Sequence, residues 1–154
     1  MKSDEYYIKE AIKQARKCSS SEDVPVGAVI VREGQIIARG YNQVEKKNNA
    51  TSHAEMIAIE RAIKKVGYKH LLDCDIYVTL EPCPMCSGAI VLARLRRLVF
   101  GAFDPKTGAA TSLYNITSDE RLNHRLEVLG GICEKECSLM LKDFFKKLRE
   151  RKNG

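Results

Sequence analysis

Three side chains that bind transition metals occur in two short motifs, His53-Ala54-Glu55 and Pro82-Cys83-Pro84-Met85-Cys86. Two cysteines separated by two residues direct both sulfur atoms at one ion when a helix begins between them. A neutral histidine nitrogen completes a set of three ligands, which leaves one tetrahedral position for water, as in catalytic zinc sites. The sequence therefore predicts one Zn²⁺ per subunit, held by His53, Cys83 and Cys86.

A carboxylate stands next to these predicted ligands. Glu55 follows His53 by two residues, so the same helix start can present it to a metal-activated water without its binding the ion. Both motifs are expected at helix N-termini, where the helix dipole favours the thiolate form of cysteine. We expect Glu55 to be the catalytic acid and base.

Each motif alone has a simpler explanation. Ser52-His53-Ala54-Glu55 fits a capping box, in which Glu55 only hydrogen-bonds to the backbone of the cap. A Cys-x-x-Cys pair also occurs in redox centres and as half of a structural zinc site. The order of the motifs favours the catalytic interpretation: His-x-Glu, a strand ending in Thr79-Leu80-Glu81, and Pro-Cys-x-x-Cys form the established signature of zinc-dependent nucleobase deaminases.

Helices and strands must alternate to position these motifs. Apolar periodicity, caps and β-branched runs predict the elements in turn. Helices are expected from Ser3 to Lys17, over 52–65, over 84–93, and at the end, where Cys137 begins an apolar stripe and 142–152 is basic; strands are expected over 26–31, 35–41, 76–80 and 98–100. Glu33-Gly34 between the first two strands predicts a tight hairpin turn. This alternation implies an α/β sandwich around a sheet.

Composition sets the class of protein. The chain has 154 residues, 44% hydrophobic and 30% charged, which is typical of one domain over 1–154. It has no long apolar run and no signal-like start, so we expect a cytoplasmic protein that does not contact membranes. Its six cysteines are expected to be reduced or bound to metal. The net charge is +6, and a balance of six basic and two acidic residues over 142–152 favours a polyanionic partner.

Beyond the metal motifs, nearly the whole chain resembles the bacterial tRNA-specific adenosine deaminases, within the cytidine deaminase-like superfamily. The matching segments are Val24-Pro25-Val26-Gly27-Ala28-Val29, Asn42, His53-Ala54-Glu55, Val78-Thr79-Leu80-Glu81-Pro82-Cys83, Met85-Cys86, Gly101, Asp104-Pro105-Lys106-Thr107-Gly108-Ala109, Asn123-His124-Arg125 and Phe144-Phe145. The metal motifs mark only the superfamily, whereas the last three segments point to the tRNA branch.

This resemblance implies a three-layer α/β/α cytidine deaminase-like fold with a mixed sheet of about five strands. It implies that a metal-activated water attacks C6 of adenine, that Glu55 moves the protons, and that inosine forms at the tRNA wobble position. It also implies a homodimer that binds the tRNA anticodon arm. The residues it places at the substrate are Asn42, Ala54, Asp104, Lys106, Asn123, Phe145 and Arg149.

Other interpretations of these substrate residues and of the function stay open. Asn42 could be a turn residue, Asp104 and Lys106 solvated loop charges, and the basic residues beside Phe145 a solvated helix face. A deaminase of a free base or nucleotide, such as guanine, cytosine or deoxycytidylate, would use the same metal site. A non-catalytic RNA-binding module with structural zinc would need a fourth protein ligand and no role for Glu55.

Several residues depart from the family pattern or have no predicted role in metal binding. Ala50-Thr51-Ser52 replaces a frequent Pro-Thr-Ala, Pro84 a frequent Val, and Thr111 a frequent Gly. These changes concern loop shape rather than the metal. The remaining cysteines are expected to be buried as small hydrophobic residues, and the remaining histidines are not expected to be ligands; they are Cys18, Cys74, Cys133, Cys137, His70 and His124.

Overall fold

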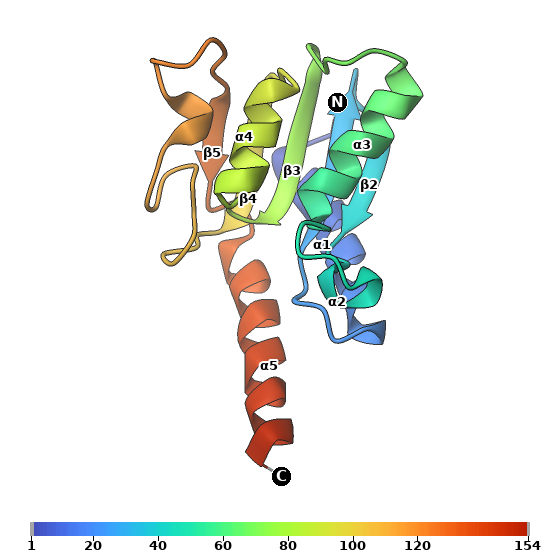
Figure 1. The fold of residues 1–154 in the computed structure, drawn as a ribbon, viewed down its shortest axis with the longest axis vertical. Helices are drawn as coiled ribbons and strands as arrows, with labels where there is room; N and C mark the ends of the chain where they lie inside the picture. The colour runs from blue at the N-terminus through green and yellow to red at the C-terminus, as the bar shows by residue number, and fades with distance from the viewer. Residues whose placement is uncertain (1, 154) are drawn as a thin grey trace.

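A five-stranded mixed sheet with the strand order β2-β1-β3-β4-β5 forms the centre of the molecule (Figure 1). The computed structural model describes residues 2–153. The strands are β1 (Gly27–Arg32), β2 (Gln35–Tyr41), β3 (Cys74–Leu80), β4 (Arg97–Ala102) and β5 (Glu127–Gly130). The helices are α1 (Asp4–Arg16), α2 (Val44–Lys47), α3 (Ala54–Val66), α4 (Pro84–Leu92) and α5 (Glu134–Asn153), with short 3₁₀ turns η1 (Lys17–Ser20) and η2 (Ile116–Ser118).

The first two strands form the predicted hairpin. Arg32 pairs with Gln35, so only Glu33 and Gly34 make the turn. Both residues have positive φ, 50° and 76°, as the type I′ turns that match the twist of a hairpin require. Gly34 adopts this conformation without steric cost.

Side chains that alternate between the two faces of the sheet explain why helices cover both of them. In β1, Ala28 and Ile30 pack in the core under α3 and α4, whereas Val29 and Val31 pack with Ile8 and other residues of α1. Both sets are buried because every second side chain of a strand points to the opposite face. Figure 1 shows α3 and α4 on one side of the sheet and α1 behind it. The predicted three-layer fold and five-stranded mixed sheet are confirmed.

Strand direction brings two helix starts together. β1 is antiparallel to both β2 and β3, so β2 and β3 run the same way and end at the same edge of the sheet. The chain passes from β2 through α2 into α3, and from β3 through three residues into α4. The N-termini of α3 and α4 therefore meet beyond the carboxyl ends of these strands, where α/β sheets commonly bind ligands.

The C-terminal part differs most from the predictions. Here β5 was not predicted as an element, and α5 starts at Glu134; the short helix α2, in the first third of the chain, was not predicted either. The predicted apolar stripe of α5 is only partly buried: Cys137 is buried, but Met140, Leu141, Phe144 and Leu148 keep part of their surface exposed. The reason is that α5 leaves the sheet after its first turns and extends beyond it (Figure 1).

Two further outcomes concern the cysteines and the membrane. Cys18, Cys74 and Cys137 are buried as predicted, whereas Cys133 is only partly buried, because it lies in the turn that leads into α5. Within residues 2–153, no helix combines the length and the apolar character needed to cross a membrane.

Candidate metal and substrate site

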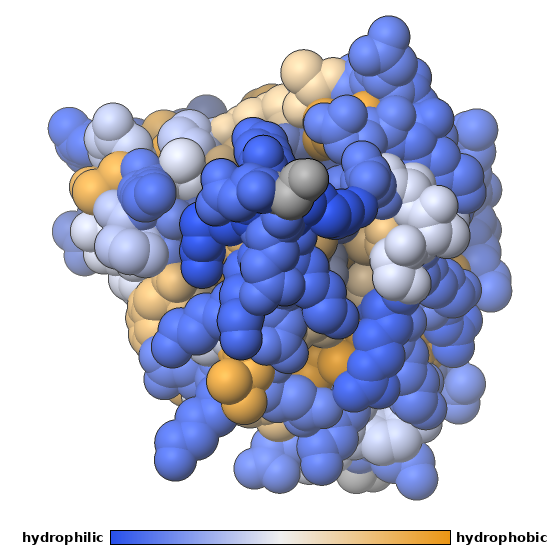
Figure 2. Space-filling model, turned by 90° about the horizontal axis from the view of Figure 1, so that it is seen from below, coloured by the Kyte–Doolittle hydropathy of each residue, from blue (hydrophilic) through white to orange (hydrophobic). Residues whose placement is uncertain are grey.

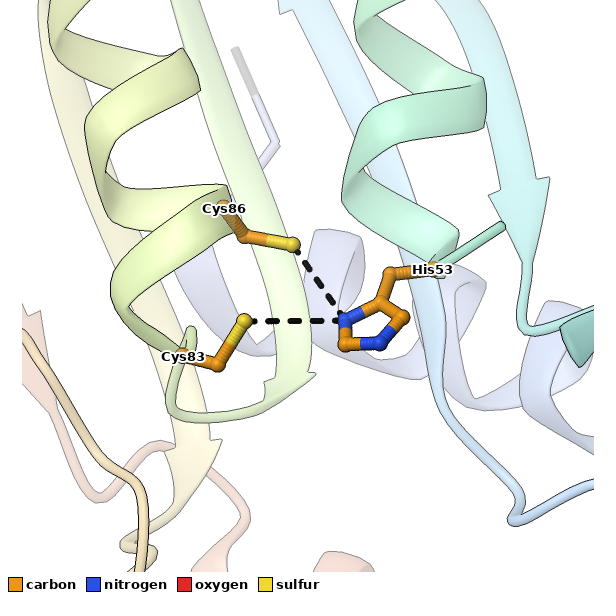
Figure 3. Close-up of side chains that lie close together, drawn as sticks. All are labelled: His53, Cys83 and Cys86. Atoms are coloured by element: carbon orange, nitrogen blue, oxygen red, sulfur yellow. Dashed lines mark hydrogen bonds between the residues drawn. The ribbon is translucent and has the colours of Figure 1, made fainter. Parts of the chain in front are cut away.

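The three predicted metal ligands converge between α3 and α4. The Nδ1 atom of His53 lies 3.6 Å from the Cys83 sulfur and 3.5 Å from the Cys86 sulfur. All three donor atoms lie within 4.8 Å of one another, and no other group of at least three such donors occurs in the described part of the chain. Figure 3 shows the three side chains pointing at one another from the two helix starts. They could hold one metal ion.

Local backbone geometry explains this convergence. His53 and Cys83 are the N-cap residues of α3 and α4, with extended backbones, and neither side chain caps its helix. Pro84 occupies the first turn of α4, where its missing N–H is not needed. The capping-box interpretation is wrong, because the N-cap is His53 rather than Ser52 and no side chain caps the helix.

The two thiols differ in acidity because they interact. A hydrogen bond from Cys86 and another from His53 lower the pKa of Cys83 to about 4. The Cys83 thiolate then raises the pKa of Cys86 far above its ordinary value, and burial adds to this. The Cys83 thiolate also raises the pKa of His53. A divalent cation among these donors would remove the mutual repulsion and allow both sulfurs to bind as thiolates.

Glu55 lies directly beside the donors. Its side chain is buried, and burial raises its pKa to about 7, although the neighbouring His53 charge acts in the opposite direction. A carboxyl group with this pKa accepts and returns a proton near neutral pH.

Two of the donor residues, His53 and Cys83, line a cavity of about 440 Å³, a size suited to small organic ligands. Ala54 and Glu55 from α3, Asn42 after β2, and Phe144, Phe145 and Leu148 from α5 also contribute to its wall; the carboxylates around it are Glu22, Asp23, Glu45, Glu55, Glu81 and Asp104. No lysine or arginine of the described chain lines it. The cavity therefore favours a neutral polar group over an anion.

Asn42 is held in place by its own loop. Its side-chain nitrogen donates to the Val24 carbonyl, and its side-chain oxygen accepts from the Val44 N–H two residues on. The second bond is that of an Asx turn, so the alternative in which Asn42 shapes a turn describes part of its role. Asn42 nevertheless lines the cavity, and these bonds fix the direction of its amide there.

The loop after β4 also lines the cavity, through Asp104 and Thr107. Asp104 accepts hydrogen bonds from the N–H groups of Lys106 and Thr107 and from the Thr107 hydroxyl. Its carboxylate thus shapes the loop at the cavity edge. Further along, the Thr111 side chain is exposed and its backbone φ is not positive, so the loop accommodates threonine in place of the frequent glycine.

A positively charged cleft adjoins the cavity. Four cations and three apolar residues line it: Lys106, Lys142, Arg149, Lys152, Leu141, Phe145 and Leu148. Phe145 and Leu148 line both the cavity and the cleft, and the Phe145 side chain is 42% exposed. Figure 2 looks onto this end of the molecule and shows small apolar areas between hydrophilic side chains. Cations beside an exposed aromatic ring suit a nucleic acid strand.

Not all predicted substrate residues come together. Asn123 is exposed in the loop before β5 and lines neither the cavity nor the cleft. The ring of the neighbouring His124 forms a hydrogen bond with the Leu95 carbonyl. Lys142 and Lys152 belong to the predicted basic segment 142–152 but were not among the residues predicted to contact the substrate. Their signal was present, because Lys142, Phe145, Arg149 and Lys152 follow one another at helical spacing on one face of α5.

Comparisons with known proteins agree with this geometry. The model of the MafB19-like deaminase family matches residues 2–149. A tRNA-specific adenosine deaminase from Bacillus subtilis is 50% identical over 154 residues, covering 100% of this chain and 96% of the relative. A solved structure from work on A-to-I editing by tRNA:A34 deaminases at the wobble position of transfer RNA superposes with a TM-score of 0.84 and 40% identity, over 88% of this chain and 99% of that one. A solved guanine deaminase from Bacillus subtilis has a TM-score of 0.62 and 43% identity, over 64% of each chain.

Proposed function

This chain belongs to the family of tRNA-specific adenosine deaminases, and from that premise we propose that it hydrolyses adenosine to inosine and ammonia at the wobble position of tRNA. The observation that carries the proposal is the His53, Cys83 and Cys86 group beside the buried Glu55. A single cytoplasmic domain with one zinc ion per subunit fits this activity.

The separation of the three donors supports zinc. Bonds of about 2.3 Å from zinc to sulfur and about 2.0 to 2.1 Å to nitrogen, at a tetrahedral angle, place sulfur and nitrogen about 3.6 Å apart. The observed separations are 3.5 and 3.6 Å. Two thiolates and one imidazole also match the ligand preference of zinc better than that of Mg²⁺ or Ca²⁺.

Zinc, when bound, supplies the nucleophile by lowering the pKa of water. Residues of the chain transfer the protons and position the base. Glu55 takes a proton from the attacking water, delivers it to N1 of adenine and then assists the departure of the 6-amino group as ammonia. Ala54 and Asn42 line the cavity and hold the base in position.

The charges around the cavity and the cleft favour RNA over a free nucleotide as the substrate. The cavity is lined by carboxylates and lacks cations in the described chain, so the phosphate of deoxycytidylate would have no partner there. The cations lie in the adjoining cleft, where Lys106 and Arg149 would meet backbone phosphates and Phe145 would stack on a base. We propose that an anticodon arm places its wobble base in the cavity and neighbouring nucleotides in the cleft, with Asp104 and Asn123 as additional contacts.

Guanine is the second candidate substrate, because the guanine deaminase structure shares 43% identity over part of the chain. Turnover should be compared on a tRNA anticodon stem-loop, guanine, cytosine and deoxycytidylate at equal enzyme concentration. Inosine formation on the stem-loop, absent in Glu55→Gln, is the expected result. Faster turnover of guanine than of the stem-loop would refute the tRNA assignment.

The surface of α4 supports the proposed homodimer. Apart from Cys86 and Ser87, this helix consists of apolar residues, proline and glycine, yet only Cys86, Ser87 and Ile90 are buried in it. Leu92 is 78% exposed, and Leu113 and Tyr114 are also exposed. Such apolar surface is typical of subunit interfaces. Light scattering should give the mass of a dimer, and Leu92→Lys should shift it toward the monomer; an unchanged dimer would exclude this face.

A further inference from the structure

A buried carboxylate with no role in the proposed chemistry holds one wall of the cavity. Glu81 follows β3 and is only 2% exposed. One carboxylate oxygen accepts hydrogen bonds from the Asp104 N–H and the Ser112 hydroxyl. The other accepts from the N–H groups of Ala110, Thr111 and Ser112, at 3.2, 2.8 and 2.9 Å. All five donors belong to the loop 104–112.

This arrangement is unusual for a buried anion. Buried carboxylates are normally paired with a cation, but no ion pair of Glu81 occurs within residues 2–153. Backbone N–H groups take the place of the cation. The contact is also close packed, because a Cβ atom added at Gly108 would lie 2.4 Å from the carboxyl carbon and from one carboxylate oxygen of Glu81.

The loop 104–112, held by Glu81, borders both the cavity and the cationic cleft. Asp104 and Thr107 line the cavity, and Lys106 lines the cationic cleft. The bond from the Asp104 N–H to Glu81 fixes the first of these residues, and Asp104 in turn orders Lys106 and Thr107 through its own carboxylate. The position of the loop at the cavity and at the cleft therefore depends on one side chain, whose five hydrogen bonds all go to the loop itself.

We infer that Glu81 is a positioning residue, which shapes the loop 104–112 for binding the nucleotides around the reacting adenosine. This inference rests on the proposed function. It makes a distinctive prediction for Glu81→Gln. The amide offers one acceptor oxygen instead of two, and even in its better orientation its NH₂ group faces the Asp104 N–H. The variant should bind RNA less well, although it has lost a negative charge and simple electrostatics would improve binding of an anion.

The test measures steady-state kinetics on an anticodon stem-loop with the zinc-loaded protein, together with zinc content and amide hydrogen exchange. For Glu81→Gln we expect KM to rise about tenfold, kcat to change less than about threefold, zinc to stay at one per chain, and exchange to speed up at the N–H groups of Asp104, Ala110, Thr111 and Ser112. Gly108→Ala, which keeps the charge but crowds both the Glu81 carboxylate and the Asp104 carbonyl, should give the same result and serves if Glu81→Gln does not fold.

Asp75→Asn is the matched control. Asp75 is another buried carboxylate; it lies near the start of β3, whereas Glu81 follows the end of this strand, and it pairs with Arg96. This variant should leave KM for the stem-loop unchanged. A lower or unchanged KM in both Glu81→Gln and Gly108→Ala would overturn the inference, as would a loss confined to kcat. A wild-type protein inactive on the stem-loop would refute the proposed function, and unchanged exchange in the loop would separately refute the role of Glu81.

Discussion

Salt dependence of RNA binding tests the cationic cleft quantitatively. Each phosphate neutralised on a single strand contributes about −0.7 to the slope of log K against log salt concentration. Lys106, Lys142, Arg149 and Lys152 line the cleft, so four phosphate contacts predict a slope of about −2.8. Affinity should then fall about sevenfold between 0.1 and 0.2 M salt. Replacing one of the four cations by alanine should bring the slope to about −2.1.

The assay is fluorescence anisotropy of a labelled anticodon stem-loop, in a Glu55→Ala background so that the substrate is not consumed. Arg149→Ala is the test variant. Lys64→Ala is the control, because Lys64 is an exposed cation near the other end of α3, about 16 Å along the helix from His53. A slope near zero, or an equal change of slope in Arg149→Ala and Lys64→Ala, would refute phosphate binding in the cleft.

Three further predictions concern chemistry, stability and metal ligation. Glu55→Gln should lower kcat by about 10² to 10⁴ while zinc analysis still finds the metal; undiminished inosine formation would remove Glu55 from its role. Asp4 accepts bonds of 2.7 and 2.8 Å from Arg97 and one of 3.0 Å from Tyr77, and its pKa is lowered chiefly by Arg97. Asp4→Asn should therefore cost about 2 kcal/mol of unfolding free energy at pH 7. Because the folded pKa lies below the unfolded one, this difference should persist above about pH 5 and shrink as the pH falls below about 4; urea titrations that show an equal difference at pH 3 and pH 7 would contradict it. Cys86→Ser should lose zinc and activity together. Cys74→Ser changes another buried thiol, which is the first residue of β3, and should keep both zinc and activity, as measured by metal analysis and the stem-loop assay.

The metal donors were predictable because their signals are local. His53 and Cys83 precede helices whose starts are marked by Ala54-Glu55 and by Pro84, and the spacing of Cys83 and Cys86 fits one turn. The hairpin was equally local, because Glu33 and Gly34 alone form its turn. Only the distance of 30 residues between His53 and Cys83 needed the fold to close it, and the shared direction of β2 and β3 does this.

The parts that were missed depend on tertiary structure. β5 has four residues with alternately exposed and partly buried side chains, so it shows too little apolar pattern to be identified without its partner β4. Glu81 accepts hydrogen bonds from backbone N–H groups 23 to 31 residues away. The sequence does not show which backbone N–H groups will act as donors, because every residue except proline has one. In the cleft, the cations of α5 follow a visible helical spacing, but their meeting with Lys106 is known only once α5 is placed against the loop.

Metal content and activity of the same preparation test the central claim most directly. Protein purified without added metal should contain one zinc per chain and form inosine in an anticodon stem-loop. Removing the zinc with a chelator should abolish inosine formation, and one equivalent of zinc should restore it. Full inosine formation by protein shown to be free of metal would contradict the assignment of His53, Cys83 and Cys86 as ligands of a catalytic zinc ion.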